Sequence, residues 1–235
     1  MSIWTFRRGF PAAALLVLLA GCAAGPDVMR RDSGTLRMPP ETVAVAGRSV
    51  VIGGPEGYCI DRSASRLRGA TAFVLLGSCA SIARDPRAGA PRTPGVLMAS
   101  VGSDTGSGPA IGAAIDQLER VLDAPAGRAA LARDGRAGSV TVLDSRREDG
   151  ALFVYLRDTG KDIAPGLAQA YWRGLFDVNG RVVTVSDIKY GDDPLAADAG
   201  QATLLGLQAR IRSETPPRTA EARPAKPGLP ANPVN

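Results

Sequence analysis

The chain has 235 residues, of which 45% are hydrophobic and 5% aromatic, and it carries a formal net charge of +5 with a pI near 9.5. It contains no histidine, which excludes Ser-His and Cys-His nucleophiles, histidine metal ligands and imidazole acid–base catalysis. The basic pI does not point to nucleic acid, because residues 42–215 hold 20 Lys and Arg against 19 Asp and Glu. The excess positive charge lies in the two ends of the chain and not in a clustered basic surface.

Residues 1–21 have the pattern of a bacterial export signal. Arg7 and Arg8 supply the positive charge, and 12–20 is an apolar run that is too short to span a bilayer. The run leads into the tetrapeptide LAGC, which ends at Cys22 and resembles the lipobox of bacterial lipoproteins. A simple cleavable signal with a chance cysteine, and export through the twin-arginine route, are the alternatives.

The lipobox resemblance implies that Cys22 is acylated and becomes the first residue of the mature protein. Two or three acyl chains hold a protein on a membrane far more firmly than one. Residues 22–41 are polar with three prolines, so we predict that they form a flexible tether. Ala23 stands where lipoproteins retained at the inner membrane typically carry Asp, which by the same resemblance implies the periplasmic side of the outer membrane.

Cys59 and Cys79 are the other two cysteines. Export would place them in an oxidising compartment, where a disulfide is the expected state. Closing a loop of about 20 residues would stabilise the fold by roughly 3 kcal/mol. Two cysteines without a histidine do not make a metal site, and we expect no metal or other cofactor.

Apolar and β-branched runs predict strands along the chain, at 42–46, 48–52, 72–79, 95–101, 139–145 and 151–157. Residues 58–67 are ambiguous, and a short helix is one interpretation of them. Pro109 begins a stretch in which apolar residues recur at helical spacing as far as Leu122, and 198–212 has a second apolar helical face. We expect both helices to pack on the sheet.

The clearest hairpin in the sequence is 171–190. The Asn-Gly dipeptide at 179–180 tolerates φ above zero at both central positions of a type I′ turn. Such a turn places Val178 opposite Arg181, so that alternate residues share a face. The face predicted to be core carries Trp172, Gly174, Phe176, Val178, Arg181, Val183 and Val185. The opposite face, which begins with Tyr171, is predicted to be more polar.

These elements predict one α+β domain over 42–215, with a mainly antiparallel sheet and two substantial helices packed on it. Residues 216–235 are rich in Pro and Ala, and we predict a disordered tail. The run YWRGLFDVNGRVVTVSDIKYGDDPL, followed by the closing helix, resembles the C-terminal half of PsbP-like domains. That resemblance implies an α/β/α sandwich around the sheet.

Two Asp-Thr-Gly triplets, at Asp104 and Asp158, are the most specific catalytic pattern. Aspartic proteases use two such carboxylates that share a proton. Both triplets lie in polar, turn-rich surroundings, however, and they are only 54 residues apart. Turns of Asp, Thr and Gly are common, so a hydrolase is the least favoured function.

The loop 102–108 follows a predicted strand and precedes a predicted helix, as phosphate-binding loops do. Asp104, Ser107 and Gly108 are its candidate ligand contacts, although no lysine follows and the charge of Asp104 would oppose an anion. A flexible loop before a helix is the simpler interpretation.

Other polar and aromatic groups have ordinary structural interpretations. Lys161 and Lys189, the only lysines inside the predicted domain, are expected to be solvated surface charges. The acidic pair 192–193 near Asp187 lacks the spacing of a known calcium loop. The aromatic residues of the hairpin are expected to serve packing.

The sequence therefore predicts a lipid-anchored envelope lipoprotein that faces the periplasm and is not an enzyme. We expect it to bind a partner protein or to serve envelope assembly or maintenance, with membrane contact through the N-terminal lipid and none with nucleic acid. A periplasmic domain that binds a small molecule or an ion is the alternative, and an acid hydrolase is less favoured.

Overall fold

The structure, a computed structural model, describes residues 38–106, 108–160, 165–191 and 196–218. Within these residues the strands are β1 (Thr42–Val45), β2 (Val50–Gly53), β3 (Tyr58–Arg66), β4 (Ala72–Ser78), β5 (Gly95–Asp104), β6 (Val140–Glu148), β7 (Ala151–Asp158), β8 (Ala170–Val178) and β9 (Arg181–Lys189). The α-helices are α1 (Cys79–Ala83), α2 (Ile115–Asp123), α3 (Pro125–Leu131) and α4 (Ala196–Glu214). No helix in this part of the chain is long and apolar enough to cross a membrane.

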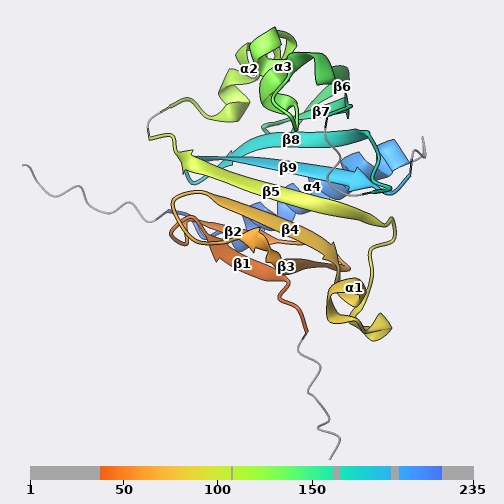
Figure 1. The fold of residues 1–235 in the computed structure, drawn as a ribbon. Coiled ribbons are helices and arrows are strands. Elements are labelled where there is room, and N and C mark those ends of the chain that lie inside the picture. Colours follow the sequence, from red (N-terminus) through yellow and green to blue (C-terminus); the bar gives the residue numbers. More distant parts are fainter. Residues whose placement is uncertain (1–37, 107, 161–164, 192–195, 219–235) are drawn as a thin grey trace, which may run out of the picture. The chain divides into compact units, whose positions relative to one another are not determined.

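One antiparallel sheet organises the domain (Figure 1). In the described part of the chain, seven strands pair in the order β3-β4-β5-β9-β8-β7-β6, and β1 pairs with β2 in a separate two-stranded sheet. Helices pack against both faces of the larger sheet. The predicted α+β class, with a mainly antiparallel sheet, is therefore confirmed.

The predicted hairpin forms from β8 and β9 with the predicted register. Val178 pairs with Arg181, and the turn residues Asn179 and Gly180 have φ of 51° and 72°. Positive φ at both positions is what a type I′ turn requires. The apolar residues of the face that carries Trp172 are buried in the core as predicted, whereas Arg181 on the same face is only half-buried.

One face of the sheet is covered by α4 together with β1 and β2. In Figure 1, α4 passes behind the strands. The apolar side chains that these covering elements contribute to the core include Val45, Val50, Ile52, Leu204, Leu207 and Ile211. They meet alternate residues of β4, β5, β9, β8 and β7, so this face holds the main core. Apolar burial of this kind, at about 25 cal/mol per Å², is the dominant favourable term in folding.

The opposite face is covered only in part. There α2 and α3 pack over β6, β7 and β8, and a second core consists of Ile115, Leu122, Leu131, Val140, Leu152, Val154, Leu156, Tyr171 and Ile188. The helix predicted after Pro109 is present as α2, which a 3-10 turn at Ile111–Ala114 precedes. Tyr171 lies on the hairpin face that was predicted to be more polar, yet only 2% of its surface is exposed. The prediction was wrong at this position because α2 and α3 cover the Tyr171 side chain.

Two elements differ from the prediction. Residues 58–66 form strand β3 and not a short helix, and β5 continues to Asp104, into the predicted loop 102–108. β3 is an edge strand with a bulge between Asp61 and Arg66, where the Asp61 carboxylate accepts two backbone N–H bonds. The bulge interrupts the alternation of apolar and polar residues that predicts a strand, and for this reason the sequence did not indicate β3.

A disulfide joins Cys59 in β3 to Cys79 at the start of α1, which confirms the predicted pairing. The two Cα atoms are 4.9 Å apart, and the sequence separation is 20 residues. Cys59 lies within a strand that pairs with β4, and not before a helix as expected. The bridge therefore ties the edge strand β3 to the start of α1, the short helix that follows β4.

Replacing both bridge cysteines by alanine will lower the free energy of unfolding by roughly 3 kcal/mol, because the unfolded chain regains the entropy that the closed loop removes. Urea denaturation of the oxidised wild type and of the Cys59→Ala/Cys79→Ala variant gives the difference. The reduced wild type is the control and should match the variant. A loss below about 1 kcal/mol would show that the bridge does not stabilise this fold.

Candidate functional site

Among the residues that the structure describes, the helices leave part of the sheet uncovered, on the outward side of β4 and β5. We call this surface the open face, and it consists of Phe73, Leu75, Val96, Met98 and Ser100. Its four apolar side chains are half-buried, whereas alternate residues of the same strands, which face α4, are fully buried. The open face is therefore an apolar sheet surface in contact with solvent.

A hollow of about 700 Å³ lies at the α1 end of the open face, and we call it the α1 hollow. Ile82 of α1, two prolines of the loop before β5, and Leu75 and Val96 of the sheet line it. Tyr190, which directly follows β9, also lines this hollow and has 55% of its surface exposed. Polar residues such as Ser81 and Arg84 line the hollow as well, so its walls are of mixed polarity. An exposed aromatic side chain beside such a hollow is typical of protein-binding surfaces.

A second hollow, of about 450 Å³, lies at the other end of the open face, and we call it the arginine hollow. Its polar lining consists of Arg66, Arg68, Thr71, Ser100 and Thr184. The guanidinium carbon of Arg66 lies 5.7 Å from the centre of the Phe73 ring, a cation–π contact. This hollow is basic and rich in hydroxyl groups, in contrast to the α1 hollow.

Lys189 is buried, so the prediction of a solvated surface charge was wrong. Its Nζ lies 2.8 Å from Oδ2 of Asp187, and only 4% and 1% of the two residues' surfaces are exposed. Within the described residues neither oxygen of Asp187 has a hydrogen bond of good geometry, so the pairing with Lys189 is electrostatic. Burial raises the pKa of Asp187 to about 6, and the positive charge of Lys189 opposes that rise.

The backbone carbonyl of Thr93 links this pair to Tyr58. It accepts hydrogen bonds from Nζ of Lys189 at 3.3 Å and from the hydroxyl of Tyr58 at 3.2 Å. Burial, and then the negative charge of Asp187, raise the pKa of Tyr58 above its ordinary value. Shifted pKa values mark many active sites, but structural ion pairs in a core produce them as well. Tyr58 belongs to the main core, which favours a structural role for the group.

Asp158 is fully buried, and donors of the protein surround its carboxylate. Oδ2 accepts the backbone N–H of Arg133 at 2.9 Å and its Nε–H at 3.1 Å, and the Tyr171 hydroxyl donates to it at 3.3 Å. Oδ1 accepts the N–H of Gly160 at 2.8 Å. Three donors converge on Oδ2 and one binds Oδ1, so the protein's own donors occupy most of the roughly four acceptor positions of this carboxylate. Asp158 therefore ties the end of α3 to β7.

The structure does not bring the two Asp-Thr-Gly triplets together. Asp104 pairs with Arg181, at the end of the sheet where β8 turns into β9. Asp158 lies at the opposite end, one residue beyond the pairing of Arg157 with Ala170. At about 3.3 Å per residue the two ends are roughly 25 Å apart, whereas a carboxylate pair that shares a proton must be in contact.

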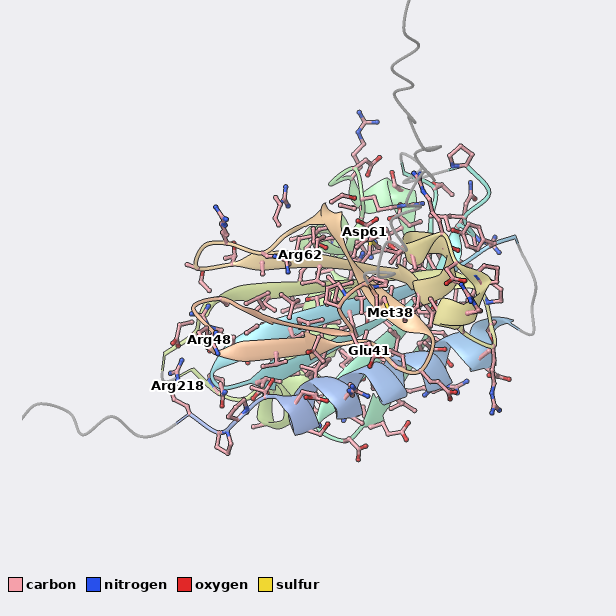
Figure 2. All side chains as sticks on the ribbon, turned by 90° about the horizontal axis from the view of Figure 1, so that it is seen from below. Met38, Glu41, Arg48, Asp61, Arg62 and Arg218 are labelled. Atoms are coloured by element: carbon pink, nitrogen blue, oxygen red, sulfur yellow. A yellow bond between two sulfur atoms is a disulfide. The ribbon has the colours of Figure 1, made fainter. Side chains whose placement is uncertain are left out.

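The predicted ligand loop is described at Asp104 and Gly108, and Ser107 lies outside the described residues. Oδ2 of Asp104 is 2.6 Å from Nη2 of Arg218, and Oδ1 accepts the N–H of Gly106 at 2.9 Å. These hydrogen bonds, that of Arg218 first, hold the pKa of Asp104 below its ordinary value. Figure 2 shows Arg218 at this end of the domain. A ligand role for the loop stays a prediction.

Other predicted residues are distributed as follows. Cys22, Lys161 and the acidic pair 192–193 lie outside the described residues. In the part that the structure describes, no three His, Cys, Asp or Glu side chains are placed to hold a metal ion. Trp172 serves packing as predicted, with its ring 5.2 Å from that of Tyr155.

The open face and its two hollows are what the sequence reasoning missed. The sequence predicted a strand at 72–79, but its continuous apolar pattern did not indicate that only one side of β4 is fully covered. The available signal was the pair Arg66 and Arg68, which stands directly before that run. No protein-family model, curated protein or solved structure matches the chain.

Proposed function

We propose that this protein is a lipid-tethered binding protein of the bacterial cell envelope, not an enzyme, and that another envelope protein docks on its open face at the α1 hollow. Acylation at Cys22 and the tether 22–41 would hold the domain on the periplasmic side of the outer membrane. The LAGC tetrapeptide and the arginines before it support this location. The resemblance of the hairpin and closing helix to PsbP-like domains supports a role in binding or assembly.

The observation that carries the proposal is Tyr190 beside the α1 hollow. Apolar side chains of β4, β5 and α1 line the hollow, and the exposed tyrosine extends this surface into solvent. Tyrosine is enriched among the residues that dominate binding energy at protein interfaces. Several side chains of a partner, apolar ones at the centre, would occupy the hollow and remove both surfaces from water.

The lining of the α1 hollow also limits the chemistry of the partner. Asp61 and Arg84 contribute one charge of each sign, and the remaining walls are apolar or small. A highly charged ligand has no matching surface there. A protein segment with an apolar residue at its centre and polar groups around it fits the arrangement of most interfaces.

Photo-cross-linking from position 190 tests the proposed docking site. Tyr190 is replaced by the photoreactive p-benzoyl-phenylalanine in intact cells, and the same residue at Ala202, exposed on α4, is the matched control. We expect one envelope protein, identified by mass spectrometry, to be captured from position 190 and not from 202. Capture of the same proteins from both positions, or of none from 190, would contradict the proposal.

A Cys22→Ala variant tests the lipid tether separately. Loss of the acylated thiol removes the membrane hold, so we expect the protein to move from the membrane fraction to the soluble periplasmic fraction. The wild type, labelled with radioactive palmitate, is the positive control. Retention of the variant in the membrane fraction would contradict lipidation at this residue.

A further inference from the structure

The arginine hollow contains two positive charges that no carboxylate of the described residues neutralises. Within the described residues neither Arg66 nor Arg68 forms an ion pair with a carboxylate, and both are exposed. Asp104, which lies near this end of the sheet, is already bound to Arg218. The hollow therefore presents unpaired guanidinium groups to solvent.

Three hydroxyl groups stand beside these charges. Thr71, Ser100 and Thr184 line the hollow, and in the described part of the chain none of their hydroxyls has a hydrogen-bond partner. Phe73 pairs with Ser100 across β4 and β5, and Ser100 pairs with Thr184 across β5 and β9. Directly paired residues in a sheet have their Cβ atoms about 5 Å apart, so these side chains form one row on a rigid surface.

The other wall of the hollow is also held in place. Nη1 of Arg181 donates to the carbonyls of Ala70 and Gly102, at 2.7 and 2.9 Å, and so attaches the loop after β3 to the end of β5. The contact with the Phe73 ring restricts the guanidinium of Arg66. The backbone of this wall and the guanidinium of Arg66 are thus ordered before any ligand arrives, which lowers the entropy lost on binding.

We infer that the arginine hollow binds a phosphate group carried by a larger molecule. Two guanidinium groups and three hydroxyls are more donors than the two oxygens of a carboxylate can use, and they match the oxygens and the charge of a phosphate. The volume of about 450 Å³ leaves room for the rest of the ligand, which would pack on Phe73 and Val182. This inference does not depend on the proposed protein partner, which occupies the other hollow.

The test measures binding of radiolabelled inorganic phosphate to the full mature chain by equilibrium dialysis. Arg66→Gln and Arg68→Gln should each raise the Kd by about tenfold or more, the effect of losing a charge-assisted hydrogen bond. Arg62→Gln is the matched control, because Arg62 is an exposed arginine of β3 that does not line the hollow (Figure 2). Absence of binding to the wild type, or equal losses in all three variants, would overturn the inference.

Vesicles distinguish the two sources of a phosphate. The vesicle test uses the Cys22→Ala background, which has no acyl anchor. Phosphatidylglycerol vesicles that sediment Cys22→Ala, but not Cys22→Ala/Arg66→Gln, and that inorganic phosphate displaces, identify a lipid headgroup. Phosphate binding without such sedimentation identifies a soluble phosphate ester. Phosphatidylcholine vesicles have no net charge and control for simple adsorption. Cross-linking from Tyr190 should be unchanged in Arg66→Gln, so the failure of one proposal does not imply the failure of the other.

Discussion

Replacing Lys189 by methionine will lower the free energy of unfolding by about 3–5 kcal/mol at pH 8, the usual cost of removing one partner from a buried ion pair. The substitution leaves the carboxylate of Asp187 buried without a counter-charge. Urea denaturation of the two proteins at the same pH measures the loss.

Two further variants decide whether the loss comes from the unpaired charge. Asp187→Asn combined with Lys189→Met removes both charges and should recover most of the stability. Glu214→Gln breaks an exposed pair with Arg210 on α4 and should change the free energy of unfolding by less than about 1 kcal/mol. A double variant as unstable as Lys189→Met alone would show that side-chain shape, and not charge, matters at this site.

The dependence of stability on pH gives a second readout of the same pair. The pKa of Asp187 is about 6 in the folded protein and 3.8 in its ordinary state, so the folded protein keeps a proton that the unfolded chain releases. Stability therefore falls by about 3 kcal/mol in total as the pH rises from about 3, below the unfolded pKa, to about 7, above the folded pKa. In Asp187→Asn/Lys189→Met this decrease should disappear. At pH 5, where Asp187 is mostly neutral, Lys189→Met should cost less than at pH 8.

The burial of Lys189 shows where sequence reasoning reached its limit. The Asn-Gly turn at 179–180 is specified by its own two residues, so the register of β8 and β9 followed directly from the sequence. Whether the last residues of β9 are buried depends on α4, which begins after them and returns across the sheet. Periodicity does not indicate where a distant helix packs.

The open face was hidden from the sequence for a related reason. β4 and the first half of β5 are apolar at consecutive positions, so their sequence does not distinguish the covered side from the open one. Only the positions of α2 and α3, over β6 to β8, leave the outward side of β4 and β5 uncovered. The disulfide, in contrast, was predictable, because two cysteines in an exported domain have a single possible pairing.

Replacing Asp158 by asparagine will lower the free energy of unfolding by about 3–5 kcal/mol, because Arg133 loses its counter-charge in a buried site. The new amide group also turns a nitrogen towards donors. If the amide nitrogen takes the place of Oδ1, it faces the N–H of Gly160. If it takes the place of Oδ2, it faces the N–H groups of Arg133 and the hydroxyl of Tyr171. Each leaves a buried donor without an acceptor.

Asp116→Asn is the matched control for this substitution, because Asp116 forms an exposed ion pair with Arg147 and should contribute less than about 1 kcal/mol. Amide hydrogen exchange locates the effect: the N–H groups of Arg133 and Gly160 should lose protection in Asp158→Asn, while those of α4 change only with global stability. If Asp158→Asn were as stable as the control, the carboxylate would not hold α3 to β7. The carboxylate oxygens of Asp158 would then be free to act as an acid or a base, and the Asp-Thr-Gly triplet at this position would again be a candidate catalytic motif.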